Sequence, residues 1–245
     1  EAVDAFEQAL KKNIPLAVVS TRGRLLAAAK EKKVPYVQIP DTGIQPRTAT
    51  GFLMRAILKV IDAEDLLAET SELAKTLRAQ DYEKAGQALA KKLKGYVPII
   101  YSSVQNFGLA YVWKIKFNET GKIPAFYNVF PELSHNEMNG FDPSFVHKIG
   151  AGVKRARKKL QESFHFIFLK DTADHPKVQK RMDVTKKLYE ERGLPVEILE
   201  LEGERSFYKI FTSLILADWT AFYTAKLYGL DPEQVPMVEK FKKLI

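Results

Sequence analysis

The sequence predicts an α/β protein whose parallel sheets are covered by helices on both faces. Three observations lead to this prediction. Its short apolar runs are rich in β-branched side chains and do not alternate with polar residues, which is typical of strands buried on both faces. Helical segments lie between these runs, as right-handed βαβ units require. The alternation occurs twice, and 245 residues leave room for one large domain or two modest ones.

The first round of alternation begins with an amphipathic helix over residues 2–12, in which Val3, Phe6 and Leu10 recur at helical spacing. No capping residue precedes this helix and the chain does not begin with methionine, so we expect the natural protein to extend upstream. Two apolar runs, an alanine-rich stretch between them and a spaced apolar pattern predict the next elements. These are strand 15–20, helix 25–30, strand 34–39 and helix 48–63.

A charged stretch over residues 64–93 has widely spaced apolar residues and predicts a helical connection. The second round follows it. Apolar runs predict strands over 97–101, 125–130, 164–169 and 196–201, and helical patterns predict helices over 107–116, 176–192 and 207–228. The last helix is apolar nearly all round, which predicts burial. Two rounds imply either two doubly wound sheets or one long sheet built from both.

The composition excludes several classes of protein. Without cysteine the chain has no disulfide, no thiolate metal site and no cysteine nucleophile. No apolar run reaches the roughly 18–20 residues that cross a bilayer, so we expect a soluble cytoplasmic protein without a membrane partner. A net charge of +8 favours an anionic partner. The basic cluster 154–159 lacks interleaved aromatic residues, and we interpret it as a solvated helix face rather than a nucleic-acid site.

Ligands of doubly wound sheets bind beyond the carboxyl ends of the strands. The loops to inspect are therefore 20–24, 41–47, 102–106 and 131–140. The last of these is the most polar, and it fits either a well-capped turn or a functional loop. A metal site there would use Glu132, His135 and Glu137, but one histidine with two carboxylates is a weak zinc set.

Three further candidates lie outside that polar loop. Glu119 ends an apolar helix, where a carboxylate is either solvated or held in a cleft as a base. Arg47 follows a proline just before a helix and suits an oxyanion or phosphate, although surface arginines are common. Lys242 lies in the tail, where basic residues complement a helix dipole. Of the histidines, His175 suits a helix cap and His165 is expected to be structural.

Taken in order, these segments resemble the bifunctional phosphoglucose/phosphomannose isomerases of archaea and bacteria, which are built from two SIS (sugar isomerase) domains. The residues that carry the resemblance are Pro46-Arg47, Phe117-Asn118-Glu119, the loop from Phe130 to Glu137 that contains His135, and the closing segment from Pro236 to Lys242. It extends over essentially the whole chain. It implies part of a first SIS domain over 1–64, a helical connection over 65–94, and a second SIS domain over 95–245 with closing C-terminal helices.

The resemblance implies a catalytic role for four residues. Glu119 would shuttle a proton between C1 and C2 of the sugar, and Arg47 would stabilise the enediolate charge. His135 would serve ring opening, reaching into the site of a neighbouring subunit in a homodimer. Lys242 would act in ring opening or near the phosphate. The implied reaction interconverts glucose 6-phosphate, and mannose 6-phosphate, with fructose 6-phosphate, and it requires no metal, nucleotide or redox cofactor.

The sequence departs from the family pattern in two places. The family's glycine- and serine-rich loops, which bind the sugar and its phosphate, would lie upstream of Glu1. We therefore expect an incomplete first domain and little activity from this stretch alone. Val235 stands where the family has a threonine that accommodates both C2 epimers, which weakens the expectation for mannose 6-phosphate. The segment 141–161 is longer than is typical of the family.

The alternative from another class is an SIS-type protein that binds a sugar phosphate without turning it over. Such a sensor would need Arg47 but has no use for Glu119 and His135 together, so their joint presence favours the enzyme. Other SIS isomerases, acting on a pentulose or hexulose phosphate, are single-domain enzymes, and two SIS-like halves in one chain disfavour them.

Overall fold

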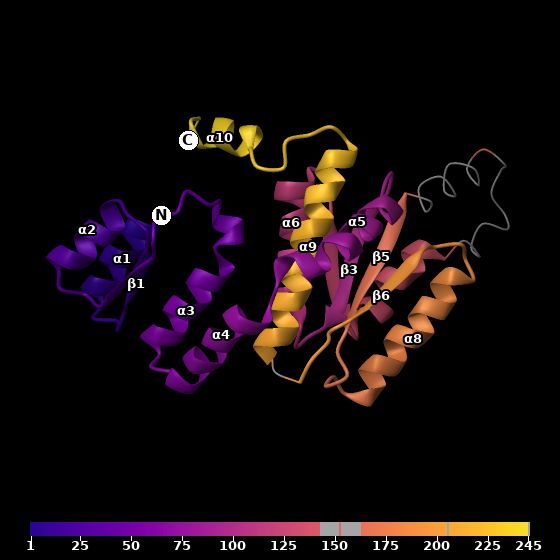
Figure 1. Cartoon of the computed structure of the whole chain (residues 1–245), viewed down its shortest axis with the longest axis horizontal. Coiled ribbons are helices and arrows are strands. Elements are labelled where there is room, and N and C mark those ends of the chain that lie inside the picture. Colours follow the sequence, from indigo (N-terminus) through magenta and orange to yellow (C-terminus); the bar gives the residue numbers. More distant parts are fainter. Residues whose placement is uncertain (143–151, 153–162, 205, 245) are drawn as a thin grey trace. The chain divides into compact units, whose positions relative to one another are not determined.

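The computed structural model describes residues 1–142, 152, 163–204 and 206–244, and it consists of two compact units (Figure 1). The first unit is Glu1–Thr76 and the second is Leu77–Ile245. The division falls within the stretch predicted to be a helical connection. The basic cluster 154–159 and most of the segment 141–161 lie outside the described residues.

The first unit holds a two-stranded parallel sheet and four α-helices. In chain order its elements are α1 (Ala2–Lys11), β1 (Val18–Ser20), α2 (Arg24–Glu31), β2 (Tyr36–Gln38), the 3-10 turn η1 (Pro46–Thr48), α3 (Thr50–Val60) and α4 (Glu64–Thr76). Val18 pairs with Tyr36 and Ser20 with Gln38. Phe6, Val18, Ala29 and Val34 form a small buried core beneath this sheet.

The second unit holds a four-stranded parallel sheet in the order β4-β3-β5-β6. In chain order its elements are η2 (Ala79–Tyr82), α5 (Glu83–Lys92), β3 (Val97–Ser103), α6 (Phe107–Lys116), the π-helical turn η3 (Phe117–Gly121), β4 (Phe126–Phe130), the 3-10 turns η4 (Glu132–Ser134) and η5 (Glu137–Phe141), β5 (Phe164–Lys170), α8 (Pro176–Glu190), β6 (Val196–Glu200), α9 (Ser206–Leu227) and α10 (Pro236–Lys242).

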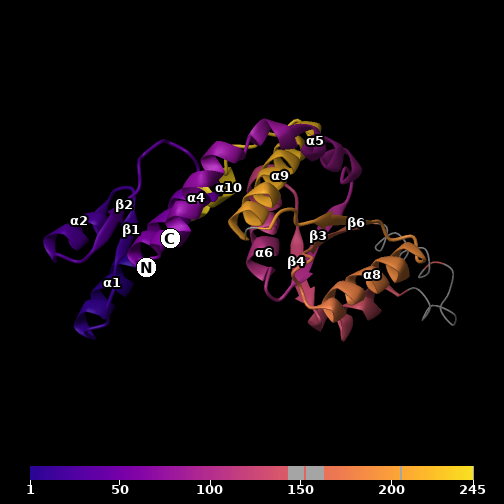
Figure 2. The same ribbon diagram turned by 60° about the horizontal axis from the view of Figure 1, so that its bottom comes forward.

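Helices cover both faces of this sheet, and the central strands are buried on both sides. Ile100 of β3 and Ile167 of β5 face one core, to which α5, α6 and α9 contribute. Their neighbours Tyr101 and Phe166 face the opposite core, which α8 covers. Figures 1 and 2 show α9 and α8 on opposite sides of the strands. Burial on both faces explains why these strands appear in the sequence as continuous apolar runs.

Among the described residues the strands form two parallel sheets, one within each unit. The predicted strands of the first unit are shortened at their proline-containing ends. The pairing begins at Val18 and Tyr36, after Pro15 and Pro35, because proline has no N–H to donate to the ladder. The helix predicted from residue 48 begins at Thr50, since Pro46–Thr48 forms a separate 3-10 turn.

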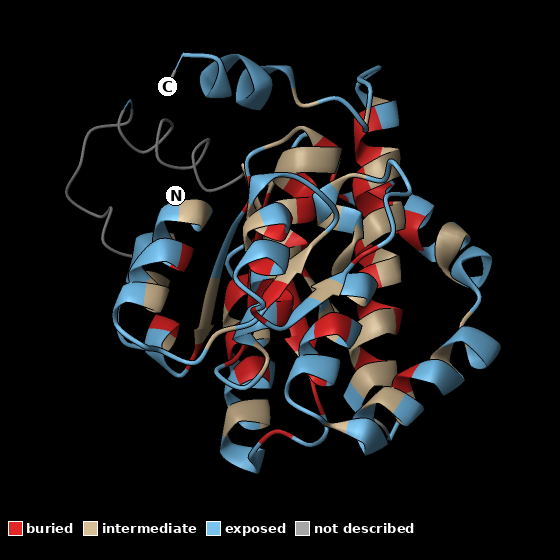
Figure 3. Cartoon of the chain, turned by 90° about the vertical axis from the view of Figure 1, so that its left-hand side faces the viewer, coloured by how far each residue is buried: buried red, intermediate tan, exposed pale blue. Residues whose placement is uncertain are grey.

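Helix α9 is buried along much of its length, as predicted (Figure 3). Its buried surface is partly made of small polar residues. The hydroxyls of Thr220 and Thr224 donate to carbonyls four residues earlier, at 2.7 and 2.8 Å, so burial leaves these groups satisfied. Small side chains allow α5 to approach closely. A methyl group added at Gly86 of α5 would lie 2.4 Å from Cβ of Trp219.

Candidate active site

Glu119 lies in the π-helical turn η3, which continues α6 into a tight bend before β4. Three hydrogen bonds close this bend. The carbonyl of Phe117 accepts hydrogen bonds from the amides of Lys122 and Ile123, and the side-chain amide of Asn118 donates to the carbonyl of Ile123 at 3.0 Å. The Glu119 side chain is half-buried. Single π turns inserted into α-helices occur frequently at functional sites, and this one holds the carboxylate on a rigid support.

His135 follows β4 and ends the short turn η4, where it is exposed. The neighbouring acidic residue has a structural role. The Glu137 carboxylate accepts hydrogen bonds from the hydroxyl of Tyr101 and the side-chain amide of Asn128. Burial raises the pKa of Tyr101, and the charge of Glu137 raises it further, so Tyr101 stays a donor. The metal set of Glu132, His135 and Glu137 is therefore disfavoured, because Glu137 is occupied by these contacts.

Strand β4 separates Glu119 from His135. The turn of Glu119 precedes the amino end of β4, and its Phe117 packs in the core shared with α9. The turn of His135 follows the carboxyl end, and its Leu133 packs in the core shared with α8. The two turns therefore lie at opposite ends of one strand, and their buried residues Phe117 and Leu133 pack on opposite faces of the sheet. His135 lies at the carboxyl end of a strand, where ligands of doubly wound sheets bind. Glu119 does not, so a search limited to carboxyl ends would not have found it.

Arg47 lies in the first unit, in the turn η1 between β2 and α3, and is half-buried. The turn is held by Thr48, whose hydroxyl donates to the carbonyl of Gln45 at 2.7 Å. Arg47 follows the carboxyl end of β2, as the sequence predicted. The loop after β1 lies at the same edge, since Arg22 forms an ion pair with Asp41 at 3.0 Å. Arg47 thus belongs to one unit, and Glu119, His135 and Lys242 belong to the other.

Lys242 lies in α10, all of whose residues are exposed (Figure 3). Its ammonium contacts the carboxylate of Glu239 at 3.0 Å, one turn earlier in the same helix. Val235 is the residue before the helix and gives it no side-chain cap. A threonine at this position could cap the first turn with its hydroxyl.

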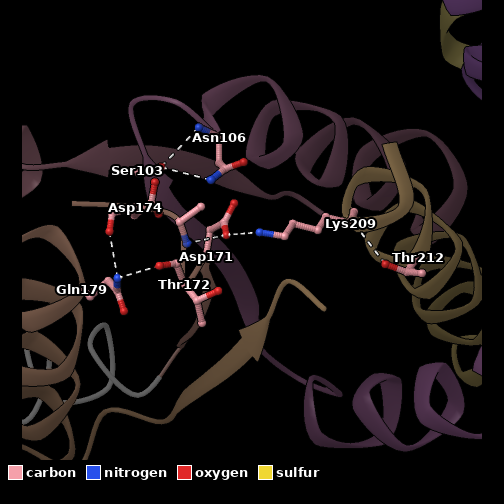
Figure 4. Close-up of polar contacts among 9 residues, drawn as sticks. Ser103, Asn106, Asp171, Thr172, Asp174, Gln179, Lys209 and Thr212 are labelled. Atoms are coloured by element: carbon pink, nitrogen blue, oxygen red, sulfur yellow. Dashed lines mark hydrogen bonds and ion pairs between the residues drawn. The ribbon is translucent and has the colours of Figure 1, made fainter. Parts of the chain in front are cut away.

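A buried ion pair lies where the strand order of the second sheet reverses (Figure 4). The chain leaves β3 and β5 toward opposite edges of the sheet, so the ends of these two strands form the switch point. Asp171, just after β5, accepts a hydrogen bond from Lys209 of α9 at 2.6 Å and from the Ala173 amide at 2.9 Å. At the end of β3, the Ser103 hydroxyl accepts from the side-chain amide of Asn106 at 3.2 Å.

Both charges of this pair are largely shielded from water, with 12% of the Asp171 side chain and 11% of the Lys209 side chain exposed. Burial alone would raise the pKa of Asp171, but the hydrogen bonds from Lys209 and the Ala173 amide outweigh it and hold the pKa below its usual value. This pair was not predicted from the sequence. Its one visible signal was a lysine at the start of an otherwise apolar helical run.

Two further histidines, His175 and His165, have the structural roles that were predicted, and His147 lies outside the described residues. His175 caps α8, and its ring nitrogen accepts a hydrogen bond from the Lys177 amide at 3.1 Å. His165 is buried in β5, edge-on to the ring of Tyr96.

Among the described residues, no three acidic or histidine side chains gather as a metal site would require. No α-helix in this part of the chain has the length and apolar character of a membrane span.

Comparison with solved structures identifies the class of protein. The chain matches the crystal structure of a glucose-6-phosphate isomerase-like protein from Thermus thermophilus with a TM-score of 0.57 and 16% identity, covering 94% of this chain and 78% of the other. At this identity the match shows the fold alone. The fold is thus the parallel α/β fold found in SIS-domain sugar isomerases.

Sequence comparison gives the family. Residues 82–245 match the model of the bacterial phospho-glucose isomerase C-terminal SIS domain, so the chain belongs to this family. A bifunctional phosphoglucose/phosphomannose isomerase of Aquifex aeolicus is 29% identical over 245 residues, which cover 99% of this chain and 71% of the relative. One from Thermoplasma acidophilum is 29% identical over 251 residues, covering 100% of this chain and 72% of the relative. The resemblance inferred from the site residues is confirmed.

Proposed function

We propose that the protein is a cytoplasmic aldose–ketose isomerase of carbohydrate metabolism. It interconverts glucose 6-phosphate, and also mannose 6-phosphate, with fructose 6-phosphate through a cis-enediol intermediate. The observation that carries this proposal is the half-buried carboxylate of Glu119 on the closed π turn. Relatives that align with nearly the whole chain are named for the same pair of activities.

The chemistry of this reaction matches the four candidate residues. Glu119 removes the proton from C2 of the open-chain aldose, and negative charge develops on O1, where Arg47 stabilises it. Return of the proton to C1, with transfer of the O2 hydroxyl proton to O1, gives the ketose. His135 and Lys242 act as the acid and base that open the ring. No metal, nucleotide or redox cofactor takes part in these steps.

A sensor that binds a sugar phosphate without turnover is the alternative, and an activity measurement separates the two. We expect the full-length protein to convert glucose 6-phosphate in a coupled isomerase assay. Glu119→Gln should lower kcat by at least about a hundredfold, because it removes the base but keeps the shape of the side chain. Glu190→Gln, which changes an exposed carboxylate on α8, is the matched control and should leave kcat unchanged.

Circular dichroism of both variants checks that the fold is intact. Near-wild-type turnover of Glu119→Gln would show that Glu119 is not the base. A wild-type protein that binds the sugar phosphate but does not isomerise it would support the sensor instead.

We also propose that two copies of the chain share their sites. This would bring Glu119 of one copy together with His135 of another, which β4 separates within one chain. The edge strand β4 also presents an aromatic face that suits a second copy. Phe107, Tyr111 and Phe126 are more than two-fifths exposed there, and Tyr111 stacks edge-on to Tyr127 with ring centroids 5.4 Å apart.

Mixing inactive subunits tests this sharing. His135→Ala and Arg47→Ala subunits should regain part of the activity when mixed, because one mixed site then has every group. Absence of recovery would indicate a site within one subunit. Tyr127→Glu should shift the molar mass measured by light scattering toward the monomer, and an unchanged dimer mass would exclude this face as the interface.

Val235 should limit the use of the second aldose. We expect Val235→Thr to raise kcat/KM for mannose 6-phosphate relative to glucose 6-phosphate, since the added hydroxyl can both cap α10 and contact the sugar. The assay is the same coupled reaction with the two aldose phosphates. Equal changes for both substrates would show that the hydroxyl does not discriminate between the epimers.

The proposal keeps the domain organisation inferred from the sequence. Residues 1–64 would form part of a first SIS domain, 65–94 the connection, and 95–245 a second SIS domain.

A further inference from the structure

Lys122 connects the turn of Glu119 to the segment 231–235, which leads into α10. Its ammonium donates to the carbonyl of Glu119, to the carbonyl of Gln234 at 2.5 Å and to the carbonyl of Pro232 at 3.5 Å. An ammonium has three N–H donors, and the last carbonyls of a helix have no partner within it. The cation thus satisfies the backbone of the candidate base itself and holds the segment 231–235 against the turn.

The backbone of Lys122 supports a role for its side chain. Lys122 adopts φ 59° and ψ 30°, the left-handed conformation. Glycine is the usual residue at such a position after a helix, because a side chain strains it. Here Gly121 stands one position earlier, packed against Phe117 and Ala221. The backbone at this position is therefore strained, and the same residue makes three hydrogen bonds through its ammonium. Strained residues of this kind cluster at functional sites.

We infer that Lys122 is a positioning residue for the proposed isomerisation, and this inference rests on the proposed function. It fixes the turn that carries Glu119 relative to the segment that ends in Val235 and continues into the helix of Lys242. Lys122 does not need to contact the sugar. It acts by holding the base and the C-terminal segment in one arrangement, and a misplacement of about 1 Å in such an arrangement can cost up to a hundredfold in rate.

The test replaces Lys122 by the residue that the backbone prefers. Lys122→Gly removes the three hydrogen bonds. Because glycine adopts the left-handed conformation without strain, the protein should remain folded. We expect kcat for glucose 6-phosphate to fall about tenfold or more while KM changes less than about twofold. Lys122→Arg keeps the cation and should recover part of the loss. Amide hydrogen exchange over residues 231–242 should become faster in Lys122→Gly, whether or not the enzyme turns over.

Lys33→Gly is the matched control. Lys33 is also a left-handed lysine, with φ 55°, but it is exposed and makes no side-chain hydrogen bond to the described residues. Its replacement should leave kcat and the exchange of 231–242 unchanged.

The outcomes separate the inference from the proposed function. Unchanged exchange over 231–242 in Lys122→Gly would refute the connection. Faster exchange with unchanged kcat would show a purely structural contact and overturn the positioning role. A wild-type protein without isomerase activity would refute the proposed function, and with it this inference, before any variant is compared.

Discussion

The close approach of α5 and α9 makes Gly86→Ala a sharp test of the packing in the second unit. The added Cβ would lie 2.4 Å from Cβ of Trp219 and 3.0 Å from the backbone nitrogen of Thr220. Carbon atoms in contact prefer separations of about 3.5–4.0 Å. The obstructing atoms belong to the backbone or are bonded directly to it, so no rotamer change can relieve the clash. The two helices must therefore move apart by about 1 Å.

The expected cost follows from two opposing effects. Overpacking a close contact costs about 1–3 kcal/mol, and a contact against backbone lies toward the upper end. Alanine is more favourable than glycine inside a helix by about 1 kcal/mol, which offsets part of this. Gly86→Ala should therefore lower the free energy of unfolding by about 1–2 kcal/mol. Urea titration followed by tryptophan fluorescence measures this, since both tryptophans, Trp113 and Trp219, lie in the second unit.

Gly108→Ala supplies the control, because it makes the same chemical change in another helix of the same unit. A Cβ at Gly108 of α6 meets no atom within 4 Å. This variant should keep the helix-propensity gain and become slightly more stable than wild type. The two variants should thus shift stability in opposite directions. If Gly86→Ala is as stable as wild type, or if it matches Gly108→Ala, the inference of a tight contact is wrong.

Three other substitutions test the polar contacts. Asp171→Asn should lower the free energy of unfolding, measured by urea titration, by about 2–4 kcal/mol, because Lys209 is left buried without its counter-ion. The double variant Asp171→Leu/Lys209→Met should lower it by less, because no unpaired charge remains buried. A double variant at least as destabilised as Asp171→Asn would contradict the role of the pair. Burial lowers the pKa of His165, so as the pH falls below about 6.5 the unfolded chain takes up the proton first and stability is lost. His165→Phe should flatten this loss between pH 7.5 and 5.5 in urea titrations, and equal losses in both proteins would exclude His165 as the cause. Tyr101→Phe should cost about 1–3 kcal/mol in thermal or urea unfolding, because Glu137 loses a buried donor, and an unchanged stability would show that the bond contributes little.

The strands and helices of the second unit could be predicted well because their burial leaves a direct signal in the sequence. Strand β5 is buried on both faces, and the predicted strand 164–169 differs from it only by Lys170. Helix α6 matches the predicted range 107–116. The strands of the first unit were harder to delimit, since apolar residues continue through Pro15 and Pro35 although proline cannot donate to the ladder.

The site could be predicted only in part. Residue types and spacing suggested His135 and Arg47, because both follow strands at carboxyl ends. Glu119 lies at the opposite end of β4. Its place at the end of an apolar helix left both a solvated carboxylate and a base open, and the family resemblance favoured the base. The bonds of Lys122 to Pro232 and Gln234 could not be predicted, since they join residues more than a hundred positions apart and depend on a left-handed backbone that glycine would be expected to occupy.

The pair of Asp171 and Lys209 has a consequence for protein design. In doubly wound sheets the switch point is where a ligand normally binds, and in the second unit the protein fills that place with its own charges. Asp171 and Lys209 pair with each other there, where a charged ligand would otherwise pair with a charged side chain of the protein. Replacing both with small residues would empty a polar space next to Ser103 and Asn106, on a scaffold whose strands are buried on both faces. The second sheet is thus a ready framework for installing a new binding pocket without altering the residues assigned to isomerisation.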